Sequence, residues 1–83
     1  MSMTVQVKLC AVLRDVAGTE ACRMVLQSGA SGLELKARLI EQYHRLEGWM
    51  SCTRLAINSE YRPWETALRD GDEVALIPPV SGG

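Results

Sequence analysis

At 83 residues, the chain has room for one domain with a modest hydrophobic core. Its 9 basic and 10 acidic residues give a net charge of -1, which argues against nucleic acid or an anionic membrane surface as a partner. The hydrophobic share of 47% is typical of a folded protein, and no apolar run is long enough to span a bilayer.

The start of the chain and the cysteines indicate a reducing compartment. Strand-like alternation begins directly after Met1 to Thr4, without the basic segment and apolar core of a signal peptide, so we expect a cytoplasmic protein. The cysteines are odd in number and include no Cys-x-x-Cys pair, which argues against a disulfide framework. They are Cys10, Cys22 and Cys52. Because His44 is the single histidine, no metal site is expected.

The first part of the chain predicts two strands that pair as a hairpin. Residues 4–10 and 22–27 both alternate along the chain, with the period of a half-buried strand. The connection at 11–18 is expected to be irregular, with a short helical turn. The side chains expected to face the core are Val5, Val7, Leu9, Cys22, Met24 and Leu26.

A central helix is predicted to follow. Ser31 and Glu34 form the capping-box pattern that begins a helix, and Gly48 is expected to end it. Apolar residues recur at steps of three and four, as expected for a helix with one face on a sheet. These residues are Leu35, Leu39, Tyr43 and Leu46.

The last part of the chain predicts three further strands. Leu55 and Ile57 form the core side of a strand at 54–58, and a turn leads to a short strand at 61–62. The last strand runs from 73 to 77, after a turn at Asp70-Gly71. This order indicates an α+β protein in which one main helix packs on one face of a mixed sheet, the β-grasp architecture.

We interpret residues 1–77 as the folded domain and residues 78–83 as a flexible tail. Pro78 and Pro79 donate no ladder hydrogen bonds, so the last strand must stop there, and two prolines in a row hold the backbone extended. Gly82 and Gly83 have no Cβ and would pass through a narrow channel of another protein. A frayed terminus without a function is the alternative.

The sheet face that the helix leaves uncovered is predicted to carry small apolar residues at the root of the tail. We predict that this patch contacts a partner protein, because anything that grips the tail must also touch it. The alternative is scattered apolar surface, partly covered by loops. The predicted interface residues are Cys10, Ala56, Tyr61, Ala75 and Ile77.

The sequence shows no catalytic set of its own. His44 has no nucleophile near it in the sequence, and a turn explains Asp70, Asp72 and Glu73 better than a calcium loop does. The reactive group that remains is the α-carboxylate of Gly83, and no cofactor is expected to bind to this chain.

The C-terminal residues resemble the signature of the small subunit of molybdopterin synthase, a family of ubiquitin-like sulfur carriers. The resemblance lies in residues 70–75, Asp-Gly-Asp-Glu-Val-Ala, and in residues 78–83, Pro-Pro-Val-Ser-Gly-Gly. The Leu-Arg-Asp of residues 13–15, which leads to Gly18, and the Ala-Ile-Asn of residues 56–58 are similar too, so the resemblance covers nearly all of the chain.

The resemblance implies that an adenylating enzyme uses ATP to activate Gly83, and that a sulfur donor then converts it to a thiocarboxylate. It also implies a large synthase subunit, joined to this chain in a heterotetramer, that passes the sulfur to a cyclic pterin precursor. Gly83 would carry the sulfur, and the tail residues that enter the partner would be Pro78, Pro79, Val80, Ser81 and Gly82. The alternatives are a related carrier for thiamine or cysteine synthesis, a modifier joined to lysines, and a ubiquitin-like binding module without chemistry.

Overall fold

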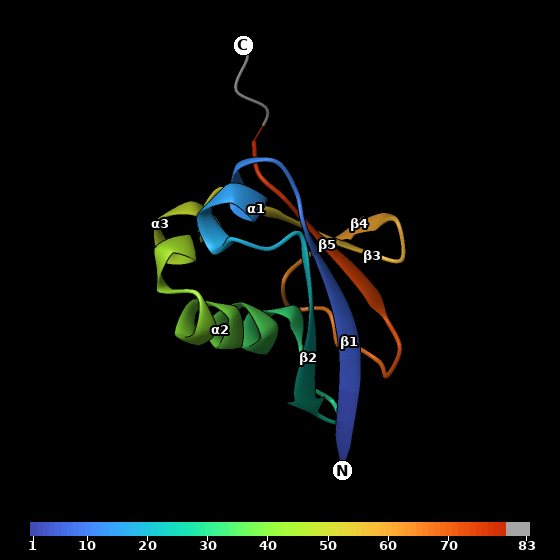
Figure 1. Cartoon of the computed structure of the whole chain (residues 1–83). Coiled ribbons are helices and arrows are strands. Elements are labelled where there is room, and N and C mark those ends of the chain that lie inside the picture. The colour runs from blue at the N-terminus through green and yellow to red at the C-terminus, as the bar shows by residue number, and fades with distance from the viewer. Residues whose placement is uncertain (80–83) are drawn as a thin grey trace.

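The computed structural model describes residues 1–79. Its strands are β1 (Ser2–Leu9), β2 (Ala21–Gln27), β3 (Arg54–Ile57), β4 (Glu60–Arg62) and β5 (Glu73–Ile77). Its helices are α1 (Val12–Ala17), α2 (Gly32–Gln42), the 3₁₀ helix η1 (His44–Leu46) and α3 (Glu47–Met50). Within this part of the chain the strands form one five-stranded sheet in the order β2-β1-β5-β3-β4 (Figure 1).

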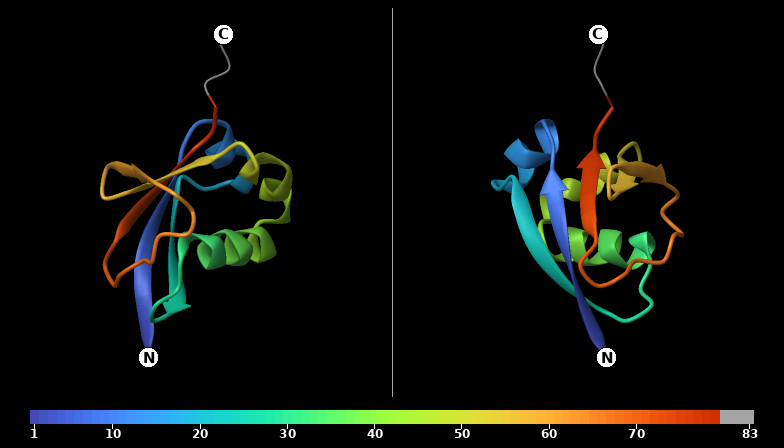
Figure 2. Two further views of the ribbon diagram at one scale, coloured as in Figure 1. Left: turned by 180° about the vertical axis from the view of Figure 1, so that it is seen from behind. Right: turned by 90° about the vertical axis from the view of Figure 1, so that its right-hand side faces the viewer.

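The sheet is mixed, with helices on one side. β1 and β5 are parallel, and the other neighbouring strands are antiparallel. The helices lie on one side of the sheet and α2 runs across the strands, which confirms the predicted β-grasp architecture (Figure 2). No helix within residues 1–79 is long and apolar enough to cross a membrane. β5 lies between β1 and β3 and ends at the opposite end of the molecule from Met1.

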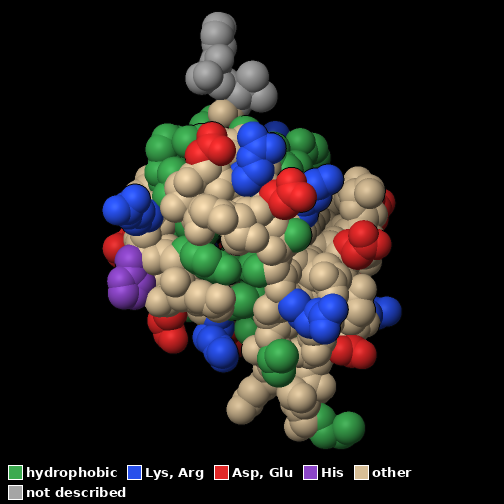
Figure 3. Space-filling model, viewed as in Figure 1, with side chains coloured by type: hydrophobic (Ala, Val, Ile, Leu, Met, Phe, Trp, Pro, Cys, Tyr) green, Lys and Arg blue, Asp and Glu red, His purple; other side chains and the backbone are tan. Residues whose placement is uncertain are grey.

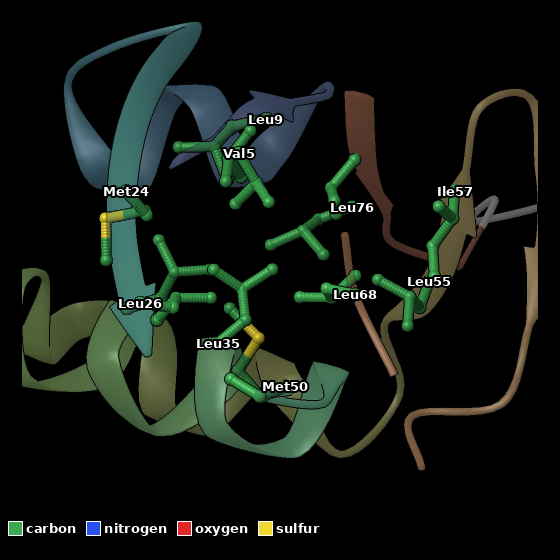
Figure 4. Packing of buried hydrophobic residues seen from close by; sticks show 14 of the residues in the cluster. Val5, Leu9, Met24, Leu26, Leu35, Met50, Leu55, Ile57, Leu68 and Leu76 are labelled. Atoms are coloured by element: carbon green, nitrogen blue, oxygen red, sulfur yellow. The ribbon is translucent and has the colours of Figure 1, made fainter. Parts of the chain in front are cut away.

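The core fills the space between the inward side of the sheet and α2 (Figure 4). Val5, Leu35 and Leu76 are completely buried there. The predicted inward side of the first two strands is confirmed, although Cys22 is only half-buried. Because successive strand residues point to opposite faces, this arrangement also decides which side chains the open face carries.

The start of α2 follows the predicted capping box. The N–H of Leu33 donates to the Ser31 hydroxyl at 3.2 Å, and the N–H of Ser31 donates to the Glu34 carboxylate at 3.0 Å. These bonds satisfy donors that the first turn of a helix leaves without an intrahelical partner. The main helix therefore begins where the local sequence predicts it.

The end of α2 differs from the prediction, because the helix stops at Gln42 and Gly48 lies inside α3. Tyr43 leaves the helical region with φ -128° and ψ 81°, although its N–H still donates to the Leu39 carbonyl at 2.7 Å. This break turns the chain, so that Leu46 and Met50 are both buried in the core. A straight helix would have carried these side chains along its own axis instead of back under the sheet.

The predicted turn at Asp70-Gly71 is confirmed and is bonded to the strands beside it. Gly71 has a positive φ of 85°, and its N–H donates to the Thr4 carbonyl at 2.8 Å. The Thr4 N–H donates in return to the Asp70 carboxylate at 2.7 Å. The Asp72 carboxylate accepts from the Asn58 amide at 3.0 Å, and Asn58 accepts from the Glu73 N–H at 3.0 Å. These acids thus hold the start of β5 in place.

Candidate functional site: the end of the last strand

β5 delivers the chain to the candidate site from the middle of the sheet. Val74 and Leu76 are buried and pair with both β1 and β3, so the strand has little freedom to move. Pro78 is buried as well, whereas Pro79 is exposed. The packed part of the chain therefore extends one residue beyond the strand.

An apolar groove lies beside the end of β5 and the two prolines that follow it. It has a volume of about 610 Å³ and is formed by the end of β5, the start of α1 and a residue of α3. Its lining residues are Cys10, Ala11, Val12, Trp49, Ile77, Pro78 and Pro79. At this end of the molecule, hydrophobic side chains lie on both sides of acidic and basic ones, and further hydrophobic side chains lie near the middle of the face in view (Figure 3). The groove can receive an apolar side chain of a partner.

The open face of the sheet carries the other predicted interface residues. Ala56 lies between Ala75 on β5 and Tyr61 on β4, directly opposite both in the ladders. Its neighbours leave Ala56 only 6% exposed, whereas Tyr61 is 61% exposed. The side chains that this face leaves accessible are therefore the Tyr61 ring and the half-buried Ala75 rather than Ala56.

The structure brings the predicted residues together in two groups. Cys10 lies just beyond β1, which ends at Leu9 rather than at residue 10, and it lines the groove rather than the sheet face. Ala56, Tyr61 and Ala75 lie on the open face, and Ile77 borders both groups because it ends β5. The predicted tail residues Val80, Ser81, Gly82 and Gly83 lie outside the described residues.

Sequence reasoning missed Val12 and Trp49 as parts of this site. Val12 opens α1 and Trp49 lies on α3, and the two helices come together only through the fold. The aromatic side chain of Trp49 was a signal, because a half-buried Trp near a surface is common in interfaces. Its partner residues in the groove could not have been identified from local sequence.

The half-buried Cys22 thiol is poorly suited to nucleophilic chemistry. All three cysteines are free. Burial raises the pKa of the Cys22 thiol above its ordinary value, an effect that a hydrogen bond with Tyr43 offsets in part. A raised pKa leaves less thiolate at neutral pH, and the thiolate is the nucleophile. Cys52 is exposed and donates to the Trp49 carbonyl at 3.4 Å.

The parallel pairing of β1 with β5 and the helix across the sheet define this chain as a β-grasp protein. Residues 7–83 match the ThiS family, to which the chain belongs. It is 42% identical to a molybdopterin synthase sulfur carrier subunit from Chlamydomonas reinhardtii, over 98% of this chain and 100% of that protein. The family resemblance predicted from the terminal motif is thereby confirmed.

Solved structures agree with this assignment. The small archaeal modifier protein 1 from Haloferax volcanii is 27% identical, with a TM-score of 0.87 over 94% of this chain and 99% of that one. A chain in the complex of subunits 1 and 2 of the molybdopterin-converting factor from Helicobacter pylori is 29% identical. Its TM-score is 0.67, over 98% of this chain and 100% of that one.

Proposed function

We propose that this protein is the sulfur carrier subunit of a molybdopterin synthase, with the sulfur carried as a thiocarboxylate on Gly83. The observation that carries the proposal is the 42% identity with a named sulfur carrier subunit over 98% of this chain. The geometry supports it, since β5 is held between two strands and ends next to an apolar groove. The domain thus offers a fixed base for presenting the last residues to another protein.

The chemistry requires an activating enzyme. A carboxylate is a poor electrophile at neutral pH, so the Gly83 carboxylate first attacks ATP, giving an acyl-adenylate and pyrophosphate. A sulfide-equivalent donor then forms the C–S bond while the C–O bond to AMP breaks. The large synthase subunit takes up the thiocarboxylate, and the sulfur passes to a cyclic pterin precursor. The carboxylate that remains is loaded again.

The partners are therefore the adenylating enzyme and the large synthase subunit. The Helicobacter pylori structure of subunits 1 and 2 in one complex supports the second partner, which we place in a heterotetramer with this chain. We place the protein in the cytoplasm, where thiols stay reduced, and the free cysteines support this location. ATP is consumed on the partner, so this chain needs no cofactor of its own.

The test is intact mass spectrometry of the full chain after incubation with ATP, the adenylating enzyme and a sulfur donor. We expect a mass increase equal to the exchange of one oxygen for one sulfur, and an unchanged mass with a competent enzyme would overturn the proposal. Deletion of Gly83 should abolish loading without lowering the melting temperature. A deletion variant that still supports pterin conversion would contradict the assigned role of Gly83.

The likeness to the archaeal modifier protein supports a second candidate, a modifier joined to lysines through the same adenylate. Conversion of the pterin precursor with the large subunit separates the two, because a modifier would form amide bonds instead. Carriers for thiamine or cysteine synthesis stay open as alternatives and would fail the same conversion assay.

A further inference from the structure

Arg54 and Tyr61 form a stacked pair on the open face of the sheet. Tyr61 is opposite Ala56 across the β3–β4 ladder, and Arg54 precedes Ala56 by two positions, so both side chains lie on one face. The guanidinium carbon of Arg54 is 4.9 Å from the centre of the Tyr61 ring, within the range of a cation–π contact. The ring therefore holds the cation in a defined place.

This pair lies next to the end of β5. Arg54 is directly opposite Ile77, the last residue of β5, in the β3–β5 ladder. Arg54 also lines a groove of about 440 Å³ with Tyr61 and Trp64. A partner that covers Ile77 and Tyr61 would therefore reach the Arg54 guanidinium as well.

Arg54 has unused hydrogen-bonding capacity. Within residues 1–79, the ion pairs join Arg14 to Asp15 and Arg62 to Glu60, and Arg54 takes part in neither an ion pair nor a side-chain hydrogen bond. Its N–H donors form a planar fork that fits a carboxylate. If a partner covered this cation without offering a counter-charge, the desolvation would oppose binding.

We propose that Arg54, held by Tyr61, anchors the partner interface electrostatically and that the partner places an Asp or Glu carboxylate against it. The inference rests on the proposed function, since the partner is the large synthase subunit that receives the tail. The neighbouring Ala56 and Ala75 offer little polar contact, so one carboxylate bound by the Arg54 fork would fix how the partner is oriented. Arg and Tyr are also enriched among the residues that dominate interface energies.

The test measures by calorimetry how tightly the full chain binds its cognate large subunit. Arg54→Glu is expected to weaken binding about a hundredfold, because it sets two carboxylates against each other, and Arg54→Gln about tenfold. Binding of the wild type should weaken as salt rises, and Arg54→Gln should lose most of this dependence. Arg38→Glu is the matched control, since Arg38 is exposed on α2, on the other side of the sheet. It should bind as the wild type does.

Thermal melting of each variant checks that the fold is kept. Equal affinities of Arg54→Glu and Arg38→Glu would overturn the anchor. If the two variants bind equally well but the thiocarboxylated wild type still converts the pterin precursor, the anchor is refuted and the proposed function holds. If the wild type neither binds the large subunit nor converts the pterin precursor, both the proposed function and the proposed role of Arg54 are refuted. Self-association that depends on Arg54, detected by sedimentation, would also overturn the proposal, because the face would then bind a second copy.

Discussion

Gly32 opens α2 close to Leu55 of β3 and to the backbone of Trp64, in the segment after β4. A Cβ at this position would lie 2.7 Å from Leu55 Cδ2 and 2.7 Å from the Trp64 carbonyl oxygen. The Leu55 side chain could rotate away, but the backbone carbonyl could not without moving the segment that packs under the helix. Glycine is therefore required here for close approach rather than for an unusual backbone angle.

Gly32→Ala is accordingly expected to lower the free energy of unfolding by about 1–3 kcal/mol, the usual cost of overpacking. Urea unfolding followed by circular dichroism measures the change. Gly48→Ala is the matched control, because Gly48 lies in α3 and a Cβ there meets nothing within 4 Å. That change should be neutral or stabilising by up to about 1 kcal/mol, since Ala favours a helix. Equal losses in both variants would refute the close-approach argument.

At the scale of elements, the start of α2 ties the helix to the rest of the fold. Ser31 and Ala67 form an isolated antiparallel β-bridge, and the Leu68 N–H donates to the Ala30 carbonyl at 2.8 Å. The capping bonds of Ser31 and Glu34 thus sit where the helix, the end of β2 and the segment before β5 come together. Loss of the cap would loosen more than the helix end.

We expect Ser31→Ala to destabilise the protein by about 1 kcal/mol, as for other helix N-caps. The matched control is Ser28→Ala, because Ser28 is exposed in the same connection and its side chain makes no hydrogen bond within residues 1–79. Thermal melting of both variants measures the difference. A Ser28→Ala variant as unstable as Ser31→Ala would show that the loss is not due to the cap.

At the scale of the whole molecule, the core and the proposed partner interface lie on opposite faces of one sheet. The inward side of β5, Val74 and Leu76, is buried in the core, whereas Ala75 and Ile77 stay half-exposed on the other side. Substitutions that act on binding should therefore be separable from substitutions that act on stability.

Ile77→Asp tests this separation. Arg54 lies opposite this position and would face the new carboxylate, so we expect a loss of stability below about 1 kcal/mol. Binding to the large subunit should weaken by about tenfold or more, because the proposed interface would have to bury a carboxylate in place of an apolar side chain. Calorimetry and thermal melting measure the two effects.

Val25→Asp is the control, since Val25 is 54% exposed on the same face but lies on the edge strand β2. Unfolding of Ile77→Asp would place Ile77 in the core, contrary to the register.

The part of the fold that could be predicted from sequence is the part that local physics controls. Alternation at 73–77 predicted β5 with its observed bounds, because each strand residue either faces the core or does not. Ser31 and Glu34 predicted the start of α2, because the capping bonds span a few residues. The terminal motif similarly indicated the family before any fold was known.

Tertiary structure alone decided where α2 ends and what surrounds the end of β5. Tyr43 leaves the helix so that Leu46 and Met50 can reach a core built by distant strands, and no local pattern encodes that requirement. Trp49 joins Cys10 in the groove, and Arg54 stacks on Tyr61, only once the sheet has formed. Contacts between residues far apart in the chain depend on how whole elements pack. A periodic pattern in one segment indicates which of its side chains are buried, but not which other segments they contact.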